Sequence, residues 1–382
     1  MRRVHSTITP AVVHRQARQA LQGCLDWQPY HASVTVQQLL DLLLLMAAHA
    51  ASLFDTVRRF FPFCHETAAR AVKANLPSRD RLVPGLVQGL HNVASFSRQD
   101  RRRRWLVAID IHLKPYYGQL TPGLVGGPKK QGTKWFFGYA TACVLHKHRR
   151  YTVALCPVDA KTQPHEQVTI LLDQIAAQGL KIQGVTLDSG FDSGETVLLL
   201  QERQLAYVVP LRRKGTGNNR RNRCFEGRHR QIRWTEWKTE KTRRPVKTRV
   251  LLWKGSPRTM AFAFQGWRGD QARNVHQQAL RQRDWYRRRF GIETSYRQKN
   301  QAEASTTSKD PLYRLLLEGV AYLLRQVWVV LTQCLARQQR LKPSAWVRAL
   351  TLTMLLEWLT DALRTLYPEE RAIPLDFKAF IQ

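Results

Sequence analysis

Between residues 101 and 211 the chain alternates short apolar runs with segments of helical periodicity, and this alternation constrains the fold more than any other feature. Residues 106–109 and 185–187 are continuous apolar runs of the kind found in buried central strands, and an aspartate follows each run directly. Further strand patterns cover residues 135–145 and 151–158, with a basic turn between them. The order of three strands, a helix, a strand, a helix and a strand predicts an α/β fold with an antiparallel meander at its start.

The charge of the chain indicates its class of partner. Its 382 residues include 61 Lys and Arg against 28 Asp and Glu, which gives a formal net charge of +33. A field of this sign attracts polyanions, so nucleic acid is the expected partner. The longest nearly apolar run, residues 42–54, is shorter than the roughly 20 residues of a membrane span, so no membrane is expected. The six widely spaced cysteines and the polar start of the chain predict a cytoplasmic protein.

The chain divides into regions of different character. Residues 1–100 read as short helices with scattered basic residues, which is consistent with a DNA-binding bundle of helix-turn-helix type; the alternative is a helical cap on the main domain. Residues 101–211 form the first part of the α/β core, and residues 212–268 are a basic insertion with three strand patterns. Residues 269–305 return to helix and complete the core. Residues 306–382 contain two apolar helices.

Three acidic residues stand out because of where they are expected to lie. Asp110 and Asp188 each follow a strand, and α/β folds place their sites at the carboxyl ends of strands. Glu293 lies in an arginine-rich helix pattern. Two metal ions about 3.5–4 Å apart need carboxylate oxygens as ligands, and such a pair can cleave a phosphodiester. The alternative is that each acid caps a helix or pairs with an arginine, but two such acids in one basic α/β unit favour metal ligands.

The helix around Glu293 carries further candidates. Tyr286, Arg289 and Glu293 are spaced three and four residues apart, so they share one helix face. Arg289 can donate two hydrogen bonds to a phosphate and Tyr286 one, which would fix a DNA strand against the metals. The alternative is an exposed helix on which Arg289 merely pairs with Glu293.

Three segments carry motifs that belong together. They are Asp110-Ile-His-Leu-Lys-Pro-Tyr-Tyr-Gly, Leu187-Asp-Ser-Gly-Phe191 and Tyr286-Arg-Arg-Arg-Phe-Gly-Ile-Glu293-Thr-Ser-Tyr-Arg-Gln-Lys299. In combination they resemble the cut-and-paste DDE transposases of prokaryotic insertion sequences, in the branch marked by a Tyr-x2-Arg-x3-Glu signature followed by a lysine. The two aspartates are 78 residues apart, and Glu293 follows Asp188 by 105 residues with the basic insertion between them. Lys299 follows Glu293 after five residues, where the branch has six.

The resemblance implies a ribonuclease-H-like mixed sheet with a β-rich insertion and helical regions on either side. It implies that Asp110, Asp188 and Glu293 bind two Mg²⁺ or Mn²⁺ ions, and that Tyr286, Arg289 and Lys299 bind DNA. The activity it implies is cleavage of transposon ends followed by strand transfer into target DNA, by a homodimer in a synaptic complex associated with the nucleoid. The alternatives are a related metal-dependent nuclease and a catalytically inactive, transposase-derived repressor.

Other basic and aromatic residues are candidates for contacts with DNA. Phosphate contacts are expected from the arginine run before the first strand and from the basic insertion; the alternative for the run is a solvated linker. An indole ring of the insertion can stack on a base, although each Trp there is as easily part of the insertion's core. These candidates are Arg101, Arg102, Arg103, Arg104, Arg220, Arg221 and Trp253, with Trp234, Trp237 and Trp267 as further aromatics.

Two patterns compete with this reading. Asp192 lies four residues after Asp188, but it falls in the turn beyond the strand, where an N-cap is the better interpretation. Residues 127–134 imitate a phosphate-binding loop, yet Thr133 precedes Lys134 and no strand–loop–helix context surrounds them. Neither pattern displaces the three acids.

Overall fold

The computed structural model describes residues 7–31, 33–146, 149–215, 219, 221–255, 258–266, 274–342 and 345–369. It divides into two compact units. A mixed α/β unit comprises Ser95–Arg297, and a helical unit comprises Met1–Ala94 together with Gln298–Gln382. The N-terminal and C-terminal helical regions therefore pack into one unit.

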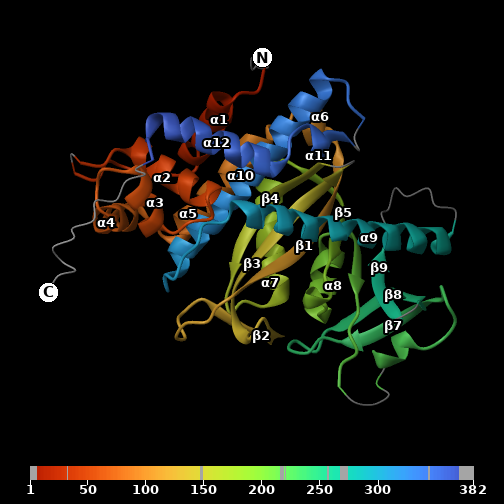
Figure 1. The fold of residues 1–382 in the computed structure, drawn as a ribbon. Coiled ribbons are helices and arrows are strands. Elements are labelled where there is room, and N and C mark those ends of the chain that lie inside the picture. Colours follow the sequence, from red (N-terminus) through yellow and green to blue (C-terminus); the bar gives the residue numbers. More distant parts are fainter. Residues whose placement is uncertain are drawn as a thin grey trace. The chain divides into compact units, whose positions relative to one another are not determined.

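One mixed sheet dominates the α/β unit (Figure 1). Its strands are β1 (Arg104–Pro115), β2 (Leu124–Lys130), β3 (Thr133–His146), β4 (Arg149–Val158), β5 (Lys181–Leu187), β6 (Ala206–Pro210), β7 (Ile232–Lys238), β8 (Pro245–Trp253) and β9 (Met260–Gln265). The order is β2-β3-β1-β5-β6-β9-β8-β7, and β4 also pairs with β3. β1 is antiparallel to β3 and parallel to β5, and β5 is parallel to β6. This is the arrangement expected of a ribonuclease-H-like core, and the predicted α/β class is confirmed.

The β-rich insertion continues the same sheet. β9 pairs with β6 in antiparallel register, from Tyr207 opposite Gln265 to Pro210 opposite Phe262, and β8 and β7 follow outward. Phe262, Phe264 and Leu251 of these strands are buried in one cluster with Val208 of β6. The insertion and the core thus share a sheet and a hydrophobic core.

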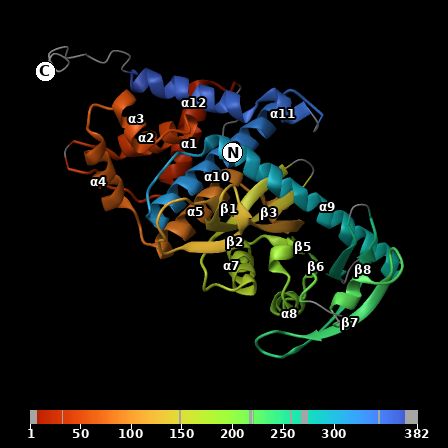
Figure 2. The same cartoon turned by 60° about the horizontal axis from the view of Figure 1, so that its bottom comes forward.

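Helices cover both faces of the sheet. They are α6 (Arg98–Arg102), α7 (Pro164–Ala177), α8 (Gly194–Glu202) and α9 (Val275–Lys299), with 3-10 turns η1 (Ser189–Phe191) and η2 (Asn222–Phe225). Figure 2 shows α7 and α8 on one face and α9 crossing the other. Pro164 at the first position of α7 and Ser193 as the N-cap of α8 fix where these two helices begin.

The helical unit packs helices from both ends of the sequence. They are α1 (Pro10–Gln22), α2 (Val36–Ala48), α3 (Leu53–Phe60), α4 (His65–Asn75), α5 (Arg79–Ala94), η3 (Asn300–Ala302), α10 (Pro311–Gln338), α11 (Trp346–Ala349) and α12 (Leu352–Leu366). α10 packs against α5, and α12 packs against α1. The apolar faces of the first helices are therefore buried by segments more than 200 residues later in the chain.

Two apolar segments of this unit differ from the sequence expectation. The strongly apolar pattern of residues 34–54, which alone predicts one helix, is divided between α2 and α3, because Ala50 has a φ of 50° and Ser52 caps α3; the two helices meet at a bend of 114°. Among the described residues, α10 alone is long and apolar enough for a membrane span, and 94% of its apolar stretch is buried inside the protein. That burial is typical of a core helix.

Candidate active site

The strand register places the two predicted aspartates side by side. Ile109 of β1 is the parallel partner of Leu187 at the end of β5, so Asp110 and Asp188 follow on neighbouring strands at the same edge. β1 itself continues to Pro115, because β3 pairs with it along its whole length. Asp110 is therefore a mid-strand residue rather than the strand-end residue that the apolar run predicted. Asp188 accepts a hydrogen bond from the Gly190 amide (3.4 Å) and caps η1.

α9 contacts the sheet at three points along one face. A Cβ atom on Gly184 of β5 would lie 2.5 Å from the Trp285 ring, so this glycine lets the helix come close. One turn later Arg289 reaches Asp110, and two turns further the Tyr296 hydroxyl donates to the Asp110 carbonyl oxygen at 3.1 Å. The same hydroxyl forms a 2.8 Å hydrogen bond with the Thr141 side chain.

Gly184, Trp285, Tyr296 and Thr141 were absent from the sequence prediction. The available signal was the spacing of Trp285, Arg289 and Tyr296 at four and seven residues, which repeats one helix face. Together these contacts hold α9 so that Arg289 and Glu293 lie beside the two aspartates.

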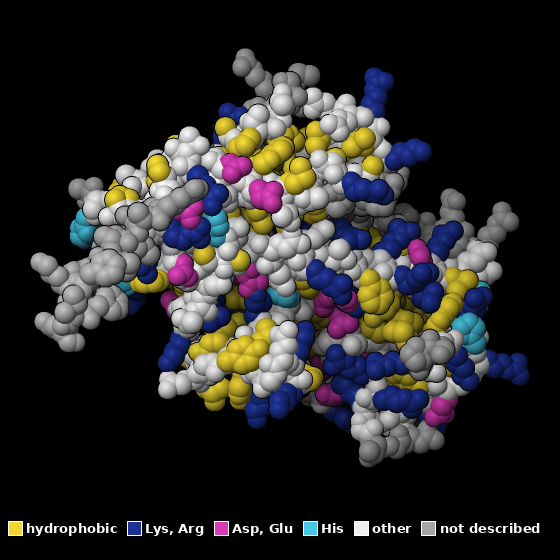
Figure 3. Space-filling view, viewed as in Figure 1, with side chains coloured by type: hydrophobic (Ala, Val, Ile, Leu, Met, Phe, Trp, Pro, Cys, Tyr) yellow, Lys and Arg dark blue, Asp and Glu magenta, His cyan; other side chains and the backbone are white. Residues whose placement is uncertain are grey.

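Arg289 joins all three predicted acids. Its Nη1 atom lies 3.0 Å from Oδ2 of Asp110, and its Nη2 atom lies 3.2 Å from Oε1 of Glu293 and 3.4 Å from Oδ1 of Asp188. The Arg289 side chain is 5% exposed, whereas those of Asp188 and Glu293 are 34% and 42% exposed. The carboxylates thus converge on one buried guanidinium with two of them open to solvent. Figure 3 shows acidic side chains at the surface of this region with Lys and Arg around them.

Burial dominates the electrostatics of the site. It raises the pKa of Asp110 to about 7, against the opposing effect of Arg289 and with a further increase from Asp188. Burial alone would lower the pKa of Arg289, but Asp110, Tyr286 and Asp188 raise it, so the guanidinium stays charged. Three carboxylates share one cation, and the cluster therefore retains an excess of negative charge in a strongly basic protein.

The chemistry of these side chains fits a divalent cation such as Mg²⁺ or Mn²⁺. Such ions prefer oxygen ligands, and the cluster supplies three carboxylates, two of them accessible. As the side chains stand, no group of three acidic, His or Cys residues in the described part of the chain is close enough to hold a metal. In the structure the three acids contact the guanidinium of Arg289 instead.

Lys299 is a correction to the predicted DNA-binding set. Its side chain is fully buried in the helical unit, where Nζ lies 2.7 and 2.8 Å from the two carboxylate oxygens of Glu318 on α10 and 3.2 Å from Glu303. Burial lowers its pKa, and Glu318 opposes that effect. A lysine held in this way stabilises the fold and does not present its charge to DNA.

Tyr286 and Arg289 are at the site, where both contact groups of the protein, and their contact with DNA stays a prediction. Tyr286 is 7% exposed, and its ring packs against Phe262 in the core of the insertion. The donor groups of Arg289 face the acids. The alternative interpretation, an ion pair of Arg289 with Glu293, is therefore part of the structure, although the helix face is buried rather than exposed.

Asp192 and Arg221 form a separate, structural pair. Arg221 is 8% exposed and contacts the Asp192 carboxylate, whose other oxygen accepts a 2.6 Å hydrogen bond from the Arg212 amide. The predicted DNA contact of Arg221 is wrong for this reason, and Asp192 is the C-cap of η1 rather than an N-cap. Arg220 lies outside the described residues.

The aromatic residues of the insertion differ in exposure. The guanidinium of Arg283 lies 3.5 Å from the ring centre of Trp253, and this partly buried ring packs on the core cluster; its stacking on a base stays a prediction. Trp237 is buried, and Trp267 lies outside the described residues. Trp234 is 60% exposed, with Lys247 and Arg249 next to its ring.

The predicted arginine run lies at and before the start of β1, six or more residues before Asp110. Arg101 and Arg102 end α6, Arg103 follows, and Arg104 begins the strand. All four are exposed, and Arg101 reaches the carbonyl of Gln178 at 3.5 Å. Their contact with DNA stays a prediction.

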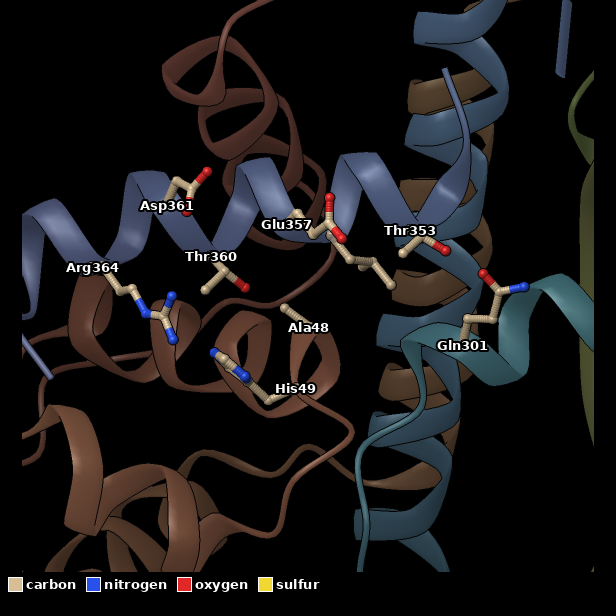
Figure 4. A pocket seen from close by; sticks show the side chains of 9 residues that line it. Ala48, His49, Gln301, Thr353, Glu357, Thr360, Asp361 and Arg364 are labelled. Carbon is tan, nitrogen blue, oxygen red and sulfur yellow. The ribbon is translucent and has the colours of Figure 1, made fainter. Parts of the chain in front are cut away.

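A pocket in the helical unit is separate from these residues. Figure 4 shows Gln301, Thr353, Glu357 and Arg364 around it, with His49 at the end of α2. Burial and the nearby Arg59 and Arg364 lower the pKa of His49. None of the residues predicted to carry function lines this pocket.

Comparison with known proteins agrees with the geometry. Residues 124–303 match the family model of the transposase DDE domain. This segment begins after Asp110 and includes Asp188 and Glu293. No curated protein matches the sequence. Among solved structures, the chain is similar to the piggyBac transposase synaptic complex with hairpin DNA, with a TM-score of 0.55 and 13% identity over 98% of this chain and 89% of that chain.

The two similarities concern different properties, the sequence of one segment and the fold of the chain. The DDE-domain match covers most of the strands and the helix with Glu293. The likeness to the piggyBac transposase, at this identity, shows a shared fold, a central mixed sheet with flanking helices. The chain therefore contains a segment similar to a transposase DDE domain within a fold similar to that of the piggyBac transposase.

Proposed function

We propose that this chain is an active DDE transposase that cleaves the DNA ends of a prokaryotic insertion sequence and joins them to target DNA. The observation that carries the proposal is the convergence of Asp110, Asp188 and Glu293 on one point at the carboxyl edge of β5. Three residues from distant parts of the chain meet there, two of them within the segment similar to a DDE domain. An inactive, DNA-binding derivative would have no need to keep this cluster.

In this proposal the three carboxylates hold two divalent metal ions. Such ions supply an activated water and stabilise the leaving oxygen of a phosphodiester. Arg289 keeps the carboxylates together, and its guanidinium is next to the position where a scissile phosphate must lie. Tyr286, Arg289 and Glu293 support an assignment to the branch of DDE transposases with the Tyr-x2-Arg-x3-Glu signature. The lysine of that signature, Lys299, is buried against Glu318 in this structure.

The DNA partner follows from the charge of +33 and from the relative, whose title describes a synaptic complex with hairpin DNA. We infer a homodimer in the synaptic complex and action on the nucleoid in the cytoplasm. If the ends are closed as hairpins, Trp234 is the insertion's candidate for stacking a displaced base, because its ring is exposed between basic side chains.

The experiment is incubation with a DNA fragment that carries the inverted repeats flanking the reading frame. With Mg²⁺ or Mn²⁺, a denaturing gel is expected to show nicks at the repeat ends, followed by hairpin or joined products. A chelator is expected to abolish the products and leave binding intact. Nicks without joined products indicate the related nuclease, and binding with no cleavage in either metal indicates the inactive repressor.

A further inference from the structure

The loop after β1 and the turn between β2 and β3 form one projection, residues 116–134, which we name the β2 lobe. Lys130 pairs with Thr133, and the two residues between them, Gln131 and Gly132, have φ values of 50° and 86°. Positive φ at both positions is the geometry of a two-residue hairpin turn. The segment that imitates a phosphate-binding loop is therefore a hairpin tip that presents lysines.

Hydrogen bonds fix the shape of the lobe. Thr133 donates to the Tyr116 carbonyl at 2.8 Å, and the Tyr116 amide donates to the Trp135 carbonyl at 2.9 Å. The Tyr117 hydroxyl donates to the Gln131 carbonyl at 2.9 Å, which ties the loop to the hairpin tip. The loop and the hairpin tip thus form one structure, and their exposed side chains are presented together.

Two large apolar side chains of the lobe face solvent. Tyr117 is 69% exposed and Leu120 is 67% exposed, the two highest values among the large hydrophobic residues that the structure describes. Figure 3 shows an apolar area over β2 with Lys and Arg side chains at its border. These two side chains add no buried apolar area to the fold. Contact with a partner that covers them would explain why large apolar side chains occupy these positions.

The positive charge of the lobe indicates which class of partner covers it. Lys129, Lys130 and Lys134 are exposed, and residues 116–134 contain no Asp or Glu. Some DNA-binding proteins insert apolar side chains between base steps from the minor groove while nearby cationic side chains contact the phosphates. Apolar side chains bordered by lysines are typical of such proteins. An acidic protein surface would also pair with the lysines, but it would not account for the exposed apolar side chains of Tyr117 and Leu120.

We propose that the β2 lobe is a wedge for duplex DNA, and specifically for the target duplex. Tyr117 and Leu120 would enter the groove and the three lysines would contact the backbone. An apolar wedge reads how easily a base step unstacks rather than the pattern of groups on the base edges, which suits the capture of varied target sequences. Tyr116 follows the end of β1 and is six residues beyond Asp110, so the lobe begins about 20 Å along the chain from the carboxylate cluster.

This inference rests on the proposed function, and its test reads binding without cleavage. The full chain is titrated, without metal, onto unrelated labelled 30-base-pair duplexes, one with central TA steps and one with a stiff A-tract. Leu120→Ser is compared with Leu366→Ser, which also removes an exposed leucine, 53% exposed on α12. Lys130→Gln is compared with Lys161→Gln, which removes an exposed lysine in the turn between β4 and α7.

The wild type is expected to bind the TA duplex roughly threefold or more tightly than the A-tract duplex, because TA steps unstack more easily. Leu120→Ser is expected to lose this preference and Leu366→Ser to keep it. Lys130→Gln is expected to reduce the slope of log affinity against log salt by about 0.9, and Lys161→Gln to leave it unchanged.

Variants that behave like their controls would overturn the wedge. The same titrations are made on a duplex that carries the element's own ends, and a loss of affinity confined to that duplex would overturn the assignment to target DNA. A wild type that binds no duplex at low salt would instead contradict the proposed function itself, so the two failures are distinguishable.

Discussion

Nη1 of Arg289 lies 3.0 Å from Oδ2 of Asp110, and this contact joins residues 179 positions apart in the sequence. Around it Asp188 and Glu293 contact the other terminal nitrogen of the same guanidinium. A cation of the protein's own thus holds the acids together. Because like charges brought this close repel one another, removing the cation changes both the fold's stability and the acids' affinity for other cations.

Arg289→Ala is expected to lower the free energy of unfolding by about 3–5 kcal/mol, since Asp110 is then a buried acid without its cation. Mg²⁺ or Mn²⁺ is expected to restore more stability to this variant than it adds to the wild type, because it supplies the missing charge. Thermal unfolding with and without metal measures both effects. Arg288→Ala, which removes an exposed arginine paired with Asp284, is the control and should change neither. Equal metal stabilisation in the two variants would contradict the account.

The raised pKa of Asp110, about 7, predicts a pH dependence of metal binding. The folded protein keeps this proton up to about pH 7, whereas an unfolded aspartate loses it near pH 4, so the ionisation of Asp110 reduces stability as the pH rises between those values. A metal needs the ionised carboxylate, and its affinity should therefore rise with pH and level off above 7. Calorimetric titration in buffers of different ionisation enthalpy should detect proton release at pH 6 and almost none at pH 8.5. Equal release at both values would contradict the assignment.

Gly184→Ala tests the close approach of α9 to β5. The added methyl would lie 2.5 Å from the Trp285 ring, and overpacking of this kind costs about 1–3 kcal/mol. Displacement of the helix should also slow cleavage, because Arg289 follows Trp285 by one turn. Gly255→Ala, after β8, is the matched control, since the atoms nearest to its added methyl would be 3.7 Å away. Chemical denaturation measures the loss of stability, and single-turnover cleavage measures the loss of rate. Identical results for both variants would contradict the close packing of α9 on β5.

Lys299→Ala separates a structural lysine from a DNA-binding one. It leaves Glu318, which is 3% exposed, without its cation, and the expected loss of stability is about 3–5 kcal/mol. Replacing both partners, Lys299→Met with Glu318→Met, should recover most of it, because no buried charge is left alone. Lys73→Ala, at an exposed position on α4, is the control. A Lys299→Ala protein of unchanged stability and weakened DNA binding would restore the original prediction.

The parts of the fold and site that could be predicted are those with local signals. Apolar runs ending in Asp110 and Asp188 located two neighbouring strands, and four-residue spacing located Arg289 beside Glu293. The strands of the insertion were also visible, because alternation along a strand is a local property.

The errors concern residues whose partners are distant in the sequence. Lys299 was expected at the DNA, but Glu318 from the next long helix buries it; Arg221 was expected there too, but Asp192 pairs with it. A basic residue looks the same in the sequence whether its counterion is a phosphate or a buried carboxylate. The same reason explains why Arg289 was expected to face DNA, since nothing local shows that Asp110 lies beside it.

The most direct test of the active site compares Asp188→Asn with Asp284→Asn. Asp284 is an exposed acid on α9 outside the carboxylate cluster, so both variants remove one negative charge from the same unit. Single-turnover cleavage of DNA carrying the element's ends is measured with saturating protein and Mg²⁺, beside an affinity measurement on the same DNA. Asp188→Asn is expected to bind normally and to lose at least about a hundredfold in cleavage rate, as for loss of a metal ligand, while Asp284→Asn cleaves like the wild type. Normal cleavage by Asp188→Asn would contradict the account.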